Sequence, residues 1–400
     1  MEQTRPVLWT KNFIILSSIN FFLTLMFFLL NATIVLYAID EFDATASMGG
    51  LVAGIFIIGT LLGRLITGLI MQSTGPKRIL TIGLIFFTLT TLLYFIDYGI
   101  TFLILTRFIH GFTLGIASTV IGTVVVFSLP ASRKGEGIGY FSMAATLATG
   151  IGPFIGLYMT QHTGFDMIFS FCLLLGIVSL ATAFFYNAPI LKKIETKRVK
   201  FEFKLSSFIE PRALPISVII LLLAFCFSSI LTYISIYAIE IDLGETASFF
   251  FVAYGAAVFI SRLFTGRLMD KKGANVIMYP AFIIFGVGMF LLSSANNSGT
   301  FLLAAALIGL GFGNIQSASQ VIAVNSVASN RVGIATATFL IFFEAGAGFG
   351  PYLLGLVIPA TGYSALYSIL GIIGVATSVL YYYLHGKKEH TYRMRAAESS

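Results

Sequence analysis

Long apolar segments alternate with short polar connections along nearly the whole chain. A bilayer core of about 30 Å needs roughly 20 apolar residues per helical crossing. Twelve segments meet this length, so we predict an all-α integral membrane protein with twelve transmembrane helices. The first segment is too long for a removed signal peptide and lacks a small-residue cleavage site, so we expect a retained helix. The predicted spans are 13–38, 48–71, 78–96, 101–127, 138–160, 167–187, 214–239, 247–269, 276–295, 300–326, 333–359 and 363–385.

A repeated motif indicates that the chain is a duplication. The stretch Arg262–Gly273 reads R-L-F-T-G-R-L-M-D-K-K-G, and Arg64–Gly68 (R-L-I-T-G) repeats its start 198 positions earlier. Gly152-Pro153 returns at Gly350-Pro351 with the same offset. A repeat at about half the chain length indicates two copies of one unit. We therefore predict two pseudo-symmetric six-helix bundles at 1–190 and 213–386, with a cytoplasmic linker at 191–212 and a cytoplasmic tail at 387–400.

The composition agrees with a membrane protein, since 57% of the residues are hydrophobic and 10% are charged. Lys and Arg residues fall in alternate loops, and the opposite loops carry Asp and Glu. Basic residues near helix ends are retained on the cytoplasmic side. Both termini are therefore expected in the cytoplasm of a multi-pass cell-membrane protein. The net charge of +7 is dispersed over loop ends, which excludes a nucleic-acid-binding face.

Three motifs resemble those of the major facilitator superfamily. They are G-x-x-x-D-K-x-G at Gly266–Gly273, R-x-x-x-G at Arg107 and Gly111, and G-P-F-I-G from Gly152. The last resembles the signature of the drug/proton antiporter branch, which includes multidrug and sugar-efflux-type exporters. The resemblance implies a secondary transporter with alternating access, driven by the proton gradient and without a cofactor.

The resemblance also implies a cytoplasmic gate made by loops of opposite halves. We expect Asp270 to contact Arg133, and Gln72 to contact Arg331 more weakly. Gln72 stands where the first-half loop of the family usually carries an acid, so the expected contact with Arg331 lacks a negative charge.

Ionisable residues inside apolar spans are costly and are functional candidates by default. Glu344 lies about twelve residues into its helix, roughly 18 Å from the end at 1.5 Å per residue. A carboxyl at that depth favours its neutral form, which suits a proton carrier. The resemblance implies that Arg107 is a proton-coupling or substrate-orienting residue. His110, three residues on, is adjacent on the helix surface and is a candidate proton relay. Each residue also has a structural interpretation. Glu344 would be an acid held by a partner, Arg107 a donor to backbone carbonyls, and His110 a core histidine whose hydrogen bonds are satisfied.

Uncharged polar residues at membrane depth either hold helices together or line the substrate cavity. The candidates are Asn31, Asn314, Gln316 and Gln320. The glycine-proline pairs at Gly152-Pro153 and Gly350-Pro351 are expected to permit close helix packing and to bend their helices.

These features predict proton-coupled export of small apolar or amphipathic compounds by a monomer. Glu344 would be the main proton-carrying acid, with Arg107 modulating its charge. No G-x-x-x-x-G-K-[ST] loop is present, so ATP is not the expected energy source.

Three alternatives remain: proton-coupled uptake of a polar solute, a polytopic membrane enzyme such as a lipid-headgroup transferase, and a non-transporting sensor. We do not expect an enzyme, because the loops are too short for a catalytic domain. No metal site is expected, and Cys172 and Cys226 read as packed thiols.

Overall fold

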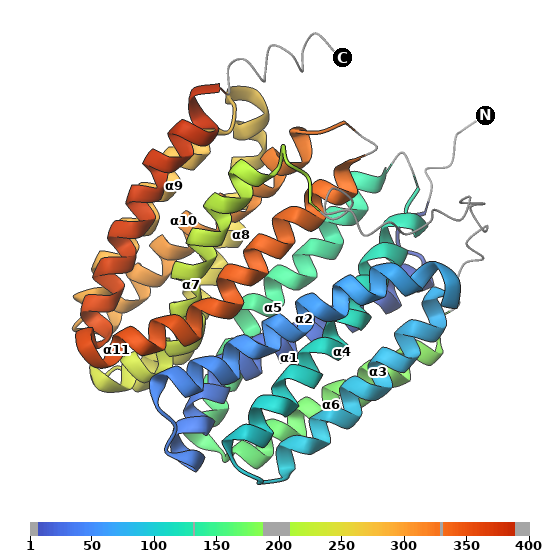
Figure 1. Cartoon of the computed structure of the whole chain (residues 1–400), viewed down its shortest axis with the longest axis horizontal. Coiled ribbons are helices and arrows are strands. Elements are labelled where there is room, and N and C mark those ends of the chain that lie inside the picture. Colours follow the sequence, from blue (N-terminus) through green and yellow to red (C-terminus); the bar gives the residue numbers. More distant parts are fainter. Residues whose placement is uncertain (1–6, 131–132, 187–208, 329–330, 389–400) are drawn as a thin grey trace. The chain divides into compact units, whose positions relative to one another are not determined.

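The computed structural model describes residues 7–130, 133–186, 209–328 and 331–388, and their regular structure is helical (Figure 1). In this part of the chain, eleven helices are long and apolar enough to cross a membrane. The predicted linker and tail lie outside the described residues, except for residues 209–212 and 387–388. The protein is therefore a multi-pass membrane protein whose described part is all-helical.

The described residues form two compact units. Unit 1 contains those of Met1–Phe42 and Ile55–Phe201, and unit 2 contains those of Asp43–Gly54 and Glu202–Ser400. Helix α2 (Ala46–Thr74) is divided, because its first turns belong to unit 2 and the rest belongs to unit 1. The other elements of unit 1 are α1 (Lys11–Phe42), α3 (Pro76–Leu92), η1 (Leu93–Phe95), α4 (Ile100–Ser128), α5 (Lys134–His162) and α6 (Phe165–Phe184). Those of unit 2 are α7 (Leu214–Glu240), η4 (Gly244–Thr246), α8 (Ala247–Lys272), α9 (Asn275–Ser293), α10 (Ser298–Asn325), α11 (Val332–Leu384) and η6 (Gly386–Lys388).

Helix α11 contains the two predicted helices 333–359 and 363–385, joined end to end across a kink. It is one helical run of 53 residues, interrupted only at Gly362, whose φ of 73° lies in the left-handed region that favours glycine. A straight helix of that length would span about 80 Å at 1.5 Å per residue. The break at Gly362 instead gives two arms, which Figure 1 shows meeting at an angle. These arms match the predicted spans 333–359 and 363–385, so a single glycine replaces the expected loop.

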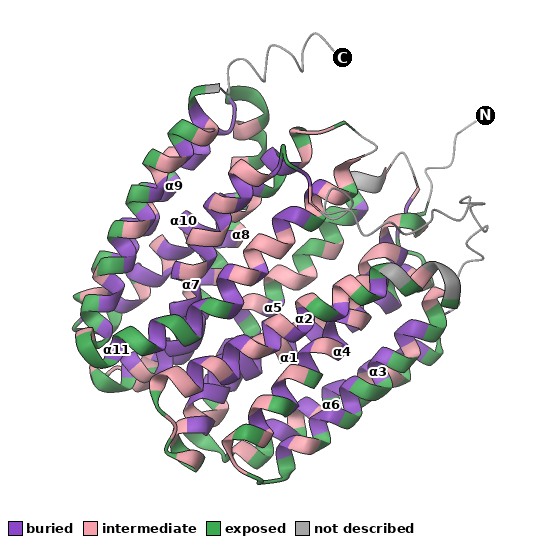
Figure 2. Cartoon of the chain, in the orientation of Figure 1, coloured by how far each residue is buried: buried purple, intermediate pink, exposed green. Residues whose placement is uncertain are grey.

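The helices bury one face against the rest of the protein and expose an apolar face suited to lipid. The buried residues of α3 include Ile79, Gly83 and Phe87, which recur at helical spacing. Ile82 and Phe86 lie on the exposed side and are as apolar as the buried face. Figure 2 shows such buried and exposed residues alternating along the helices. An apolar exposed face is what a hydrocarbon environment requires, whereas water would favour polar residues there.

Glycines set the same helix contact in both units. A Cβ atom on Gly111 of α4 would lie 1.9 Å from the carbonyl oxygen of Phe56 on α2. A Cβ atom on Gly309 of α10 would lie 2.5 Å from the carbonyl oxygen of Tyr254 on α8. Both members of the second pair follow those of the first by 198 positions. Small residues allow this close approach of membrane helices, and the repeat therefore extends from the sequence to the register of packing.

The first turns of α2 pack tightly on other helices of unit 2. The buried hydroxyl of Tyr233 on α7 donates to the carbonyl oxygen of Ala46 at 2.9 Å and to that of Pro351 on α11 at 2.5 Å. A Cβ atom on Gly54 would lie 2.0 Å from the carbonyl oxygen of Gly348. One tyrosine therefore links the start of α2 to α7 and α11.

The glycine contacts predict a selective effect of added methyl groups. Gly111→Ala should destabilise the protein by about 1–3 kcal/mol, because the methyl group overpacks the contact with Phe56. Gly122→Ala, on the same helix, should leave stability unchanged or slightly raised, since nothing lies within 4 Å of its Cβ position. Thermal unfolding of the purified variants in detergent measures both. Equal unfolding midpoints for the two variants would contradict the close α2–α4 contact.

Candidate functional site

The buried polar centre of unit 1 lies between α3, η1 and α4. Arg107 and His110 are both fully buried on α4. Arg107 Nη1 donates to the hydroxyl of Tyr94 over 3.4 Å, and that hydroxyl lies 3.0 Å from Nδ1 of His110. His110 Nε2 is 3.5 Å from Thr91 Oγ1 on α3. These four residues are the Arg107–His110 cluster, and the structure brings the two predicted proton-coupling residues of this half together.

Aromatic rings enclose this cluster. The guanidinium carbon of Arg107 lies 4.2 Å from the centroid of the Phe56 ring on α2, which is a cation–π contact. The His110 ring lies 4.3 Å from the Phe87 ring and perpendicular to the Phe56 ring. The fully buried Cys172 of α6 also lies near Arg107. The surroundings stabilise a cation while excluding water, as a membrane-embedded arginine requires.

A pocket of about 290 Å³ opens beside this cluster in unit 1. Its lining includes the exposed carboxylates of Glu41, Asp97 and Asp166 together with Tyr37 and the buried Tyr94. We call it the acidic pocket. Tyr94 is thus shared between an acidic surface cavity and a buried cation.

Glu344 is the buried acid of unit 2. It lies in the first arm of α11 with 6% of its surface exposed. Two residues later, a Cβ atom on Gly346 would lie 2.3 Å from the carbonyl oxygen of Leu221, so this part of α11 packs closely on α7. The structure therefore places the Glu344 carboxyl inside the helix bundle of unit 2, and its role as a proton carrier stays a prediction.

The four predicted cavity residues have different surroundings. Asn314 is buried, donates to the carbonyl oxygen of Leu310 at 2.7 Å and accepts from Ser261 of α8 at 3.4 Å, so its amide links two helices. Asn31 is buried, and its Oδ1 has no hydrogen-bond partner among the described residues. Gln316 is half-buried and Gln320 is exposed. Their assignment to a substrate cavity stays a prediction.

The two gate arginines pair with acids of their own units. Arg133 donates to both carboxylate oxygens of Glu136 at 2.8 and 2.9 Å, and hydrogen bonding with Glu136 raises the pKa of Arg133. Arg331 forms an ion pair with the buried Glu210, whose backbone nitrogen also donates to Thr338 Oγ1 at 2.8 Å. Burial raises the pKa of Glu210, but the bonds from Arg331 and from the Arg212 backbone outweigh it and hold that pKa below its ordinary value.

The Glu210 pair fastens the segment before α7 to the start of α11. The sequence analysis missed it, because Glu210 and Arg331 are 121 positions apart and no local pattern connects them. The side chain of Gln72 lies outside the described residues, and the predicted Arg133–Asp270 contact joins different units. Both predicted gate contacts therefore stay predictions.

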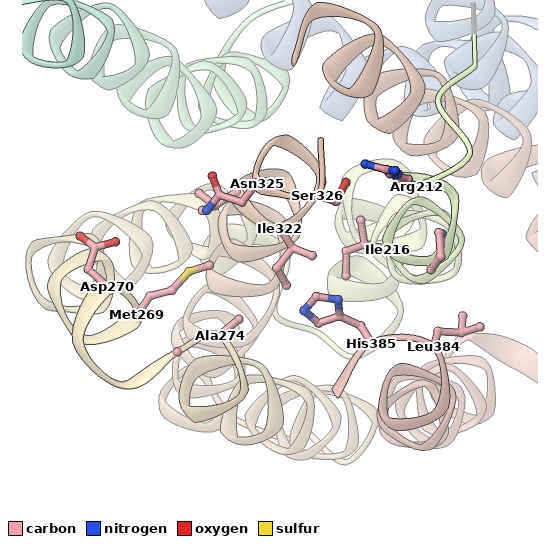
Figure 3. Close-up of a pocket in the computed structure, with 13 residues that line it drawn as sticks. Arg212, Ile216, Met269, Asp270, Ala274, Ile322, Asn325, Ser326, Leu384 and His385 are labelled. Atoms are coloured by element: carbon pink, nitrogen blue, oxygen red, sulfur yellow. The ribbon is translucent and has the colours of Figure 1, made fainter. Parts of the chain in front are cut away.

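Asp270 lies at a second pocket, which has a volume of about 300 Å³ and belongs to unit 2 (Figure 3). Its polar lining includes Arg212, Asn325, Ser326 and His385. In Figure 3 the carboxylate of Asp270 points away from these side chains. The described residues contain no group of three or more His, Cys, Asp or Glu side chains arranged to hold a metal ion.

The two predicted glycine-proline pairs lie inside helices. Pro153 is inside α5 and Pro351 is inside α11. A Cβ atom on Gly152 would lie 2.7 Å from the carbonyl oxygen of Leu25 on α1, and one on Gly350 would lie 2.1 Å from Ser228 Oγ on α7. Both glycines therefore permit close packing, as predicted.

Comparison with known proteins identifies relatives over nearly the whole chain. A model of the Major Facilitator Superfamily matches residues 16–343 and 277–398. An uncharacterized MFS-type transporter of Methanocaldococcus jannaschii is 27% identical over 391 residues, which cover 96% of this chain and 98% of that protein. The staphylopine export protein of Staphylococcus aureus is 20% identical and covers 90% of this chain and 94% of its own. The quinolone resistance protein NorA of the same species is 24% identical, and the match covers 84% of this chain and 87% of NorA.

Solved structures have the same fold at low sequence identity. The inward-open xylose transporter XylE from E. coli has a TM-score of 0.72 and 15% identity, covering 92% of this chain and 94% of its own. The nucleoside transporter NupG has a TM-score of 0.76 and 12% identity, and the match covers 93% of this chain and 100% of NupG. At these identities the likeness concerns the fold alone.

The Glu210–Arg331 pair predicts a pH-dependent difference in stability. A carboxyl with a lowered pKa stabilises the folded state above its ordinary pKa, and this contribution is lost as the pH falls through the folded-state value. Glu210→Gln should therefore cost about 1–2 kcal/mol at neutral pH, since Arg331 is partly exposed, and nearly nothing well below pH 4.5. Thermal unfolding at the two pH values measures this difference.

Glu240→Gln provides the control, because that carboxyl is exposed at the end of α7. It should have no effect at either pH. If Glu210→Gln destabilised the protein equally at both pH values, the shape of the side chain and not its charge would be responsible.

Proposed function

Because the chain belongs to the Major Facilitator Superfamily, and is therefore a transporter and not an enzyme, we propose that it exports small compounds in exchange for protons. Two relatives support the direction of transport, since one is named an export protein and the other a resistance protein. The proposed substrates are apolar or amphipathic. A hydrophilic solute such as a sugar would need many buried polar groups as partners, whereas many of the buried Ser and Thr hydroxyls already bond to backbone carbonyls of their own helices.

The proposed topology has twelve crossings in two pseudo-symmetric bundles of a monomer in the cell membrane. The two arms of α11 supply the eleventh and twelfth crossings. The matching contacts of Gly111 and Gly309 support the symmetry. The alternation of basic and acidic loops supports cytoplasmic termini.

The buried carboxyl of Glu344 is the observation that carries the proton-coupling proposal. An ionised carboxyl is unfavourable among apolar helices, whereas the protonated form is tolerated. A group in this position binds a proton when connected to one side of the membrane and releases it when connected to the other. Alternating access supplies that exchange, and the Arg107–His110 cluster provides a second charged centre in unit 1. No cofactor is needed, because the proton gradient supplies the energy.

Substrate-driven proton movement tests the proposal. Inside-out vesicles with an acidified lumen are mixed with ethidium, tetraphenylphosphonium or a quinolone, and the lumenal pH is followed with a fluorescent dye. We expect the parent protein to release protons from the lumen when a substrate is added. Glu344→Gln should abolish this release, because an amide cannot carry a proton at these pH values.

Glu240→Gln is the matched control, since it removes an exposed carboxyl of the same unit. It should retain the parent rate. Proton release that persisted in Glu344→Gln would exclude Glu344 as the carrier. Proton movement into the vesicle lumen together with the substrate would indicate cotransport and would contradict exchange.

A further inference from the structure

The acidic pocket and the Arg107–His110 cluster share one residue, Tyr94. Tyr94 lines the pocket, and its hydroxyl is hydrogen-bonded to His110 and Arg107 behind it. Tyr94 belongs to a short 3₁₀ helix (η1), and Arg107 and His110 belong to α4, where both are fully buried. Tyr94 is therefore placed to connect solvent with a buried titratable group.

The chemistry of the partners fixes the direction of each hydrogen bond. A guanidinium group only donates, so the Tyr94 oxygen accepts from Arg107. The hydroxyl proton of Tyr94 is then free for Nδ1 of His110, at 3.0 Å. This leaves the proton of neutral His110 on Nε2, facing Thr91 Oγ1 at 3.5 Å. Thr91 in turn donates to the carbonyl oxygen of Phe87 at 3.0 Å. Each link has one donor and one acceptor when His110 is neutral.

We propose that Tyr94 relays protons from the acidic pocket to His110, which is the proton-binding group of unit 1. The step breaks the O–H bond of Tyr94 while an N–H bond forms at Nδ1 of His110. A hydronium ion in the pocket gives its proton to the Tyr94 oxygen and becomes water. Tyr94 is unchanged, no electron is transferred, and one proton has moved to His110. The proposal rests on the proton-coupled transport described above.

The pocket favours proton uptake at this point. Glu41, Asp97 and Asp166 are exposed around it, and a cavity lined by one sign of charge raises the local concentration of counter-ions. Carboxylates that line the pocket can also hold protons and pass them on. The negative charges lie on the pocket side of Tyr94, and the positive charge of Arg107 lies behind it.

Protonation of His110 would place two cations against the same hydroxyl oxygen. In a low-dielectric interior, two like charges that contact the same oxygen atom repel each other strongly. The charged and titratable groups that the structure places around His110 are Arg107 on α4, Tyr94 on η1 and Cys172 on α6. The facing residues of α2 and α3 are Phe56, Phe87 and Thr91. Proton arrival therefore disfavours the present position of Arg107 and biases unit 1 toward another conformation.

Two substitutions, Tyr94→Phe and His110→Gln, test the relay in the full chain, purified and reconstituted in liposomes. Tyr94→Phe removes the hydroxyl and keeps the ring, which stacks on Phe169. We expect proton movement driven by ethidium, tetraphenylphosphonium or a quinolone to fall by at least about tenfold. His110→Gln should abolish the same movement. Exchange of labelled for unlabelled substrate across the membrane, which needs no net proton transfer, should stay near the parent rate in both variants.

Tyr98→Phe is the matched control. Tyr98 lies four residues after Tyr94 but is 77% exposed, so loss of its hydroxyl should change neither measurement. A second variant, Asp97→Asn with Asp166→Asn, alters only exposed positions and tests the pocket even if Tyr94→Phe fails to fold. It should slow proton movement and spare substrate exchange.

The outcomes separate this proposal from the proposed function. Normal proton movement in Tyr94→Phe, or in the double aspartate variant, would overturn the relay while leaving proton-coupled export intact. Loss of substrate exchange together with proton movement in Tyr94→Phe would indicate a structural role and would also overturn it. A parent protein that moves no protons with any of the three compounds would overturn both.

Discussion

A guanidinium group that cannot lose its proton, enclosed among apolar helices, determines the arrangement of the polar groups around it in unit 1. Arg107 requires electron-rich partners because its side chain is fully buried. The Phe56 ring and the Tyr94 oxygen are two of these partners. The bond from Arg107 orients the Tyr94 hydroxyl toward His110, and the tautomer of His110 follows from that orientation. One permanent charge thus orders a chain of neutral groups.

Helix packing and the polar centre depend on the same glycine. Gly111 lies one helical turn after Arg107, so both are on the same face of α4. The close approach of Gly111 to the Phe56 backbone brings the Phe56 ring over Arg107. Unit 2 repeats the helix contact at Gly309 but has the fully buried Ala305 in place of the arginine. The duplication therefore preserves the packing of the helices, while the ionisable chemistry of the two units has diverged.

The sequence predicted the features that depend on local patterns. Apolar length located the helices, and the spacing of Arg107 and His110 on one helix face predicted their proximity. Tyr94 could not be predicted, because its approach to His110 depends on the 3₁₀ turn that ends α3. Glu210 is a similar case, since its ion pair with Arg331 forms only after α7 and α11 have packed. At Gly362 the sequence suggested a loop, but a left-handed residue needs no additional residues to redirect the chain.

Tyr233 has one hydroxyl proton and two carbonyl acceptors, on α2 and on α11. A proton shared between two acceptors forms a weaker hydrogen bond with each of them than it would form with one acceptor alone. If the start of α2 separated from the tyrosine, the proton would bond fully to Pro351, and the number of satisfied groups on α7 would not change. The separation would therefore cost less than the loss of a whole hydrogen bond. Such an exchange of acceptors allows a contact between membrane helices to be well ordered and still quick to break.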